Sequence, residues 1–127
     1  MSIKILKEIK ELIKKEFGHV IISDPVIIRR KLRILLDDGS FIEIRYPTVR
    51  EYSLHWQKGS RIIRIDTAPH HRNLKSFPRH IHFKSEDNVI EDNITDLKSS
   101  PIENIKKFLN FILEMREKYK KMHKTYS

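Results

Sequence analysis

The first apolar pattern lies near the start of the chain. Ile9, Leu12, Ile13 and Phe17 stand one, three or four residues apart, with lysines and glutamates between them. This spacing places the apolar side chains on one face of an α-helix. We therefore predict an amphipathic helix over about residues 2–17.

A second helical pattern lies near the end of the chain. Ser100 is a favourable N-cap, Pro101 fits the first helical position, and Glu103 stands three residues after the cap. Together these residues form a typical helix start. The predicted helix spans about residues 101–122, and its apolar stripe comprises Ile102, Ile105, Phe108, Leu109 and Ile112.

Between the helices, over about residues 20–83, the apolar residues recur every second position, which is typical of half-buried strands. Residues 28–36 alternate apolar side chains with arginine and lysine, and they predict one strand. A turn follows in which Gly39 can adopt the positive φ of a hairpin, and residues 41–46 predict the return strand.

A second predicted hairpin joins residues 52–57 to residues 61–66. One turn geometry places His55 opposite Arg64, and the alternative shifts the partners by two positions without changing their faces. Residues 80–83 repeat the alternation and predict one more strand.

The sequence therefore predicts an α+β fold, in which an antiparallel β-meander of about four to six strands has the N- and C-terminal helices packed on one face. Residues 85–100 are mostly polar and predict a loop. The length fits a single domain over residues 1–127. The face of the meander away from the helices would carry Arg29, Lys31, Arg33, Arg45, His55 and Arg64, with Asp66 at its rim.

Composition narrows the class of protein. The net charge of +9 favours a polyanionic partner, because lysine and arginine gain affinity for phosphates through counterion release. Cysteine is absent, which excludes disulfides and thiolate chemistry. No apolar run is long enough for a membrane span, and the first residues lack the features of a signal peptide. We expect a cytoplasmic protein without a membrane partner.

The candidate chemistry is concentrated in a histidine-rich loop over residues 66–82, which holds four of the seven histidines and two of the five prolines. A segment with so few apolar residues needs a scaffold supplied by the rest of the chain. Its histidines are His70, His71, His80 and His82.

One hypothesis for this loop is a metal site. Its histidines, together with Asp66, supply ligands that suit zinc. Their spacing matches no established zinc motif, however, and the nearby arginines would oppose a cation. We therefore predict no metal and no cofactor, and keep a metal-dependent hydrolase as an alternative.

The leading hypothesis is metal-independent cleavage of RNA, which needs a base for the 2′-hydroxyl, an acid for the leaving oxygen and cations for the phosphate. Histidine titrates near neutral pH, and arginine binds phosphate with two hydrogen bonds. The candidate catalytic pair combines His70 or His71 with His80 or His82, with Asp66 orienting a histidine. The candidate nucleic-acid-binding residues are Arg64, Arg79, His55, Arg33, Arg45 and Lys31.

Two further hypotheses involve no catalysis. The same surface could bind nucleic acid without cleaving it, or the histidines could satisfy backbone carbonyls in a purely structural loop. Trp56 shares its face with Leu54 and is expected in the core, and Phe77 is expected to anchor the loop.

Three short motifs resemble a known family: residues 52–57 read YSLHWQ, residues 64–71 read RIDTAPHH, and residues 77–82 read FPRHIH. In this order they resemble the TumE family, whose members are regarded as the toxin half of bacterial and archaeal toxin–antitoxin modules. The resemblance covers about residues 32–97, and the terminal helices agree only by position. It implies motif status for His55, Trp56, Arg64, Asp66, Pro69, His70, His71, Phe77, Pro78, His80 and His82.

The resemblance also implies a function and partners. The toxic activity of the family is presumed to act on RNA, and a cognate antitoxin is expected, usually a helix-turn-helix DNA-binding protein. Thr67 and Arg79 depart from the family pattern, which has Asn and His at these positions; if either is catalytic, activity would be affected. A homodimer is left open.

Overall fold

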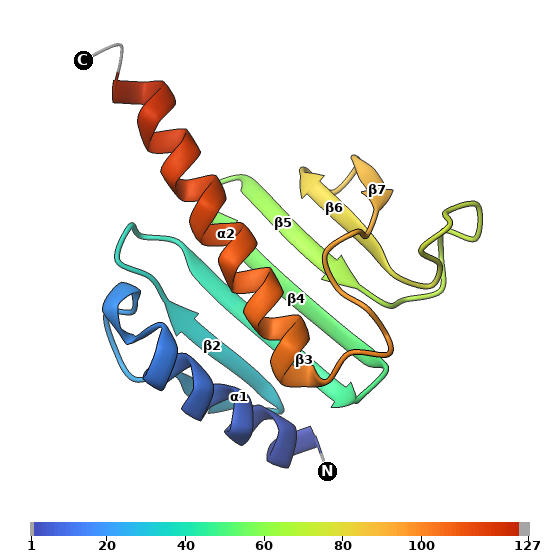
Figure 1. Cartoon of the computed structure of the whole chain (residues 1–127), viewed down its shortest axis with the longest axis horizontal. Coiled ribbons are helices and arrows are strands. Elements are labelled where there is room, and N and C mark those ends of the chain that lie inside the picture. Colours follow the sequence, from blue (N-terminus) through green and yellow to red (C-terminus); the bar gives the residue numbers. More distant parts are fainter. Residues whose placement is uncertain (1, 125–127) are drawn as a thin grey trace.

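The computed structural model describes residues 2–124, which form two α-helices, a short 3₁₀ helix and seven strands (Figure 1). In chain order these elements are α1 (Ser2–Glu16), η1 (Gly18–Val20), β1 (Val26–Ile28), β2 (Lys31–Leu35), β3 (Phe41–Thr48), β4 (Glu51–Lys58), β5 (Arg61–Asp66), β6 (His80–Lys84), β7 (Val89–Glu91) and α2 (Pro101–Lys124).

The seven strands form one sheet in which every strand pairs antiparallel with the next one in the chain. The predicted α+β meander is confirmed, although its strand count was too low. The second hairpin adopts the register that pairs His55 with Arg64 and Ser53 with Asp66. Consecutive strands are linked by short connections except where the histidine-rich loop separates β5 from β6.

One additional strand arises because the predicted strand over residues 28–36 is in fact a hairpin. Arg29 and Arg30 have φ values of 50° and 64°, so the chain reverses there and Ile27 pairs with Leu32. Left-handed backbone is uncommon outside glycine, asparagine and aspartate, and no turn residue marks this reversal in the sequence. The single-strand prediction was therefore wrong, and Arg29 lies in a turn.

The other additional strand, β7, lies within the segment predicted as a loop. Val89 to Glu91 pair with β6, with Ile90 opposite Ile81. A strand of three residues shows too little alternation to be recognised from its sequence.

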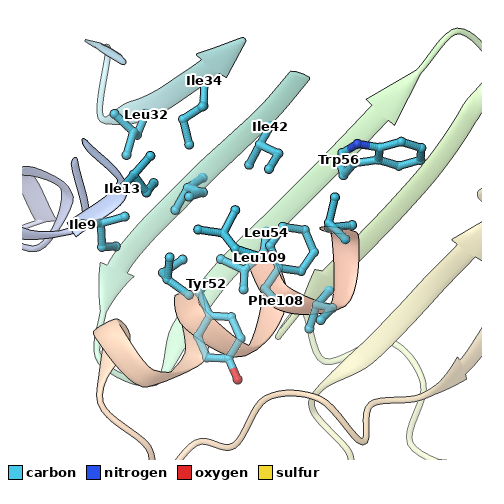
Figure 2. Close-up of a cluster of buried hydrophobic side chains, with 14 of the residues drawn as sticks. Ile9, Ile13, Leu32, Ile34, Ile42, Tyr52, Leu54, Trp56, Phe108 and Leu109 are labelled. Atoms are coloured by element: carbon cyan, nitrogen blue, oxygen red, sulfur yellow. The ribbon is translucent and has the colours of Figure 1, made fainter. Parts of the chain in front are cut away.

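The core lies between the sheet and the two helices, which pack on the same face as predicted. Figure 2 shows Ile9 and Ile13 from α1 near the strand residue Leu32, and Phe108 and Leu109 from α2 near the strand residue Leu54. Trp56 is also buried in this layer, as expected. Neither α1 nor α2 has an apolar stretch that could cross a membrane, and residues 2–124 contain no other helix of comparable length.

Polar contacts fix the connection from β7 to α2 against the core. The Tyr52 hydroxyl lies 2.7 Å from Thr95 Oγ1, and Asn104 donates a hydrogen bond of 3.0 Å to the Tyr46 hydroxyl. Burial raises the pKa of Tyr52 to about 12, so this hydroxyl stays protonated near neutral pH. These contacts lie on the helix-covered side of the sheet. The opposite face, here called the open face, carries no helix of residues 2–124 (Figure 1).

Candidate active site

Two rows of polar side chains cross the open face, because residues at every second position of antiparallel strands share a face. The register places each member of a row opposite the next on the neighbouring strand. The first row comprises Arg33, Glu43, His55, Arg64 and His82. The second row comprises Arg45, Ser53, Asp66 and His80.

Asp66 is the centre of the candidate site. Its Oδ1 lies 3.0 Å from His80 Nε2, and its Oδ2 lies 3.6 Å from His82 Nε2. The backbone amide of Ala68 donates a hydrogen bond of 3.0 Å to Oδ1, and Arg64 Nε donates one of 3.2 Å to Oδ2. The carboxylate is thus held by neighbours on both sides and faces two histidines.

The opposite ends of the two imidazole rings face backbone carbonyls. His80 Nδ1 lies 3.2 Å from the carbonyl oxygen of Pro78, and His82 Nδ1 lies 2.9 Å from that of Glu86. These contacts fix the ring orientations, as the structural hypothesis expected, but they leave both Nε2 atoms directed at Asp66.

His80 is almost fully buried, with 2% of its side chain exposed. Burial lowers the pKa of His80 below its ordinary value of 6.5, although the Asp66 charge acts in the opposite direction. A neutral imidazole has one N–H, whereas its two neighbours, the Pro78 carbonyl and Asp66, are both acceptors. His80 can therefore take up a second proton without any change of position.

His71 extends the cluster toward solvent. Its ring lies edge-on to that of His80, with 4.6 Å between centroids, and 6.2 Å from that of His82. His71 is half-buried, whereas the adjacent His70 is exposed. We call Asp66, His71, His80 and His82 the histidine cluster; sequence reasoning did not separate His71 from His70.

Arg64 connects the cluster to the rest of the open face. Its guanidinium donates two hydrogen bonds of 2.6 Å to the Glu86 carboxylate, in addition to its bond to Asp66. Glu86 is mainly exposed, and its contact with Arg64 holds the pKa of this carboxyl below its ordinary value. The Glu86 carboxylate therefore already binds the guanidinium of Arg64, a residue that the sequence analysis assigned to phosphate binding.

Beside Arg64 the open face is hollowed, with a volume of about 250 Å³. Lys31 on its wall is partly neutralised, since Lys31 and the neighbouring Arg33 both pair with Glu43. Although burial would raise the pKa of Glu43, these contacts bring it below the ordinary value. Arg45 is exposed and has no ion pair with any residue from 2 to 124. The hollow is lined by Lys31, Glu43, Arg45, Ser53, His55 and Arg64.

Arg79 makes a different set of contacts. Its Nη1 donates hydrogen bonds of 3.0 Å to the carbonyl and the carboxylate of Asp92, and another to the Thr95 carbonyl. The Asp92 side chain is fully buried. Arg79 therefore ties β6 to the connection that leads into α2 and is not directed at the hollow.

Two acidic residues of the site were missed by sequence reasoning. Besides Glu86, Glu91 accepts backbone hydrogen bonds of 2.9 and 2.8 Å from Lys75 and Ser76, and so holds the histidine-rich loop against β7. Both lie in the segment predicted as a polar loop, where no motif distinguishes them from other solvent-exposed acids.

The geometry also bears on the metal hypothesis. Within residues 2–124, one group could hold a metal ion, namely Asp66, His80 and His82, whose candidate ligand atoms lie within 4.8 Å of one another. A backbone carbonyl beside the Nδ1 atom, as found for both histidines, is typical of histidine ligands that bind a metal through Nε2. Arg64, in contact with Asp66, is a cation that would oppose the ion.

Comparison with known proteins identifies the family. The family model described as Toxin TumE matches residues 4–116, which include every member of the histidine cluster and of the hollow. Neither the comparison with curated proteins nor that with solved structures gave a match. Since the matched region spans most of the 127 residues, the chain belongs to the TumE toxin family.

Proposed function

We propose that this toxin binds RNA on the open face of its sheet and cleaves it with the histidine cluster, without a metal ion. One observation carries the proposal: the pair formed by Asp66 and the buried His80, with His82 and His71 beside it, adjoins the hollow through Arg64. The histidines that would transfer protons thus lie next to the cations that would bind phosphate.

In this mechanism His71 and His82 exchange protons with RNA, one as base toward the 2′-hydroxyl and the other as acid toward the leaving 5′-oxygen. His71 lies nearest to solvent, and its ring makes no hydrogen bond to any residue that the structure describes. His80 is the more deeply buried of the two histidines on β6, with 2% of its side chain exposed against 11% for His82, so we assign it a positioning role. Asp66 orients both rings and stabilises an imidazolium when it forms.

The hollow would hold the phosphate. Arg45 and Lys31 lie on its wall, and Arg64 lies between it and the cluster. Arg64 can bind a phosphate with two hydrogen bonds in the manner in which it now binds Glu86. We therefore infer that RNA displaces the exposed Glu86 carboxylate from Arg64.

The test is cleavage of total RNA by the purified chain between pH 5 and pH 9, with and without a chelator of divalent ions. The matched variants are His71→Ala and His70→Ala, because these neighbours differ in their contact with the cluster. We expect His71→Ala to lose cleavage by about 10²-fold or more while retaining RNA binding, and His70→Ala to retain both.

Intact RNA under all these conditions would contradict the proposal, and so would equal losses in the two variants. Salt-sensitive binding without any product would favour the non-catalytic binding module instead.

The ligand geometry of Asp66, His80 and His82 favours a second candidate, a metal-dependent hydrolase. This alternative requires stoichiometric zinc or a similar ion in protein purified without a histidine tag, and its cleavage must stop in chelator. Cleavage that persists in chelator by metal-free protein excludes it.

A further inference from the structure

A second surface lies on the helix-covered side of the molecule. An apolar groove of about 440 Å³ runs between the later turns of α2 and strand β6, and its apolar lining includes Phe83, Phe111, Met115 and Tyr119. Phe83 follows His82 on β6 and points to the opposite face of the sheet. The groove is therefore separated from the histidine cluster by the thickness of the sheet.

The helix layer leaves this groove open. In Figure 1, α1 and α2 lie over the strands from β2 to β5, the last turns of α2 run past the sheet, and no helix described by the structure lies over β6 or β7. At this end of α2, 40% of Tyr119 and 66% of Met122 are exposed. Large apolar side chains gathered along an uncovered groove are typical of a binding surface for another protein.

The charges around the groove indicate the sign of its partner. Arg61, Lys84 and Lys118 are basic, and Glu114 is the acidic residue of the lining. Arg61 also stacks over Tyr119, with 4.1 Å from its guanidinium carbon to the ring centroid, which places a cation directly beside the apolar surface. A ligand with an apolar stripe and acidic flanks complements this arrangement.

We propose that the groove binds an acidic amphipathic helix of the cognate antitoxin. Membership of a toxin family makes an antitoxin the expected partner, and a helix in a groove is a common way to bury an apolar stripe. A second copy of this chain fits less well, because it would bring another basic α2 against Lys118 and Lys84. The proposal does not depend on RNA cleavage by the open face.

Docking in this groove would place the antitoxin against β6 at Phe83 and Lys84, immediately after His82 in the chain. The antitoxin would thus hold the helix-covered side of the strand that carries two members of the histidine cluster.

The experiment measures binding of the full-length cognate antitoxin to wild-type protein and three variants. Lys118→Glu reverses a charge of the groove, and Met122→Asp places an acid on its exposed apolar end. Lys107→Glu is the matched control, since it makes the same charge change on an exposed position of α2 three turns away from Lys118.

We expect Lys118→Glu and Met122→Asp each to weaken binding by about tenfold or more and to leave the folded far-UV spectrum unchanged. Lys107→Glu should stay within about twofold of wild type. The wild-type affinity should fall with added salt, with a smaller slope for Lys118→Glu.

Equal affinities for all four proteins would overturn the proposal. It would also be overturned if the chain alone sediments as a dimer that Met122→Asp dissociates, because a second copy would then occupy the groove. RNA cleavage is assayed separately on the same variants, so failure of the open-face mechanism would not be mistaken for failure of docking.

Discussion

Asp66 illustrates how much one residue of this site depends on its neighbours. Its two carboxylate oxygens are shared among a backbone amide, an arginine and two histidines. A carboxylate in such a position fixes ring orientation and favours the charged form of a neighbouring imidazole. Asp66 should therefore affect catalysis more than RNA binding.

We predict that Asp66→Asn lowers RNA cleavage by about 10²-fold to 10⁴-fold, because the amide keeps the shape of the carboxylate without its charge. RNA binding, measured by filter retention, should change little. Asp87→Asn is the control, since Asp87 is exposed and the charge change is the same. A similar loss of cleavage in both variants would show that the effect comes from the change in net charge and not from the position of Asp66.

Glu86 offers a second test at the residue scale. If its carboxylate competes with RNA phosphate for Arg64, then Glu86→Gln should tighten RNA binding by about two- to fivefold, the size expected for one exposed ion pair. Fluorescence anisotropy with a labelled RNA measures this change, with Asp87→Asn again as the control. Weaker binding by Glu86→Gln would mean that Glu86 is needed to hold Arg64 in place.

The lowered pKa of His80 predicts how stability depends on pH. Its folded pKa lies below the ordinary value of 6.5, so the unfolded chain takes up the proton first as the pH falls. The free energy of unfolding should therefore decrease below about pH 6.5, by at most about 1.4 kcal/mol per pH unit for this one proton. A second decrease should begin below about pH 4.5, where the unfolded chain takes up a proton on Glu43 while the folded protein still holds this carboxyl charged.

Urea unfolding of wild type, His80→Asn and His19→Asn separates these two effects. His80→Asn should lose the decrease near pH 6 and keep the one below pH 4.5. His19→Asn, which replaces an exposed histidine outside the site, should keep both. If His80→Asn keeps the full dependence near pH 6, the burial of His80 is not its cause.

At the scale of elements, strand β6 contributes residues both to the histidine cluster and to the core. His80 and His82 face the cluster from it, Ile81 packs in the core, and Arg79 precedes it with its contacts to Asp92. The histidine-rich loop is fixed at the same place, because Ser76 Oγ donates to the Arg79 carbonyl at 2.6 Å. Rigidity of this strand should therefore govern the geometry of the cluster.

We predict that Arg79→Ala lowers the free energy of unfolding by about 3 kcal/mol, because it leaves the buried Asp92 carboxylate without its cation. Arg72→Ala, at an exposed position of the same loop, should cost less than about 0.5 kcal/mol. Urea titration gives both values. RNA binding of folded Arg79→Ala should be close to wild type, whereas a loss comparable to that of Arg64→Ala would return Arg79 to the phosphate-binding set.

The elements also show what the sequence could and could not predict. Alternation in residues 52–57 and 63–66 was enough to place His55, Arg64 and Asp66 on one face. The turn at Arg29 and Arg30 was not predicted, since two arginines in left-handed backbone give no turn signal. The three-residue strand β7 was too short to be recognised.

The residues that gather in the candidate site could also be predicted only in part. Residue types and motifs pointed to Asp66, His80 and His82 before any coordinates. The partners Glu86 and Asp92 were not predicted, because a side-chain ion pair between distant segments depends on how a loop closes. The same reason explains why Arg79 was wrongly expected beside the candidate phosphate-binding residues. Its contacts are with Asp92, and it does not line the hollow.

At the scale of the whole molecule, the sheet separates two surfaces. The helices bury one face and leave an apolar groove beside β6, while the open face carries the polar rows and the histidine cluster. We infer that the net charge of +9 serves both surfaces, since RNA and an acidic antitoxin helix are both anionic.

The most direct test of the central claim is the chemistry of the RNA ends that the purified chain produces. A short RNA with one cleavage position is compared with the same RNA carrying a single 2′-deoxyribose at that position, in chelator at neutral pH. We expect a 2′,3′-cyclic phosphate and a 5′-hydroxyl from the first substrate and no cleavage of the second. A 5′-phosphate product, or cleavage of the deoxy-substituted RNA at the same position, would contradict it.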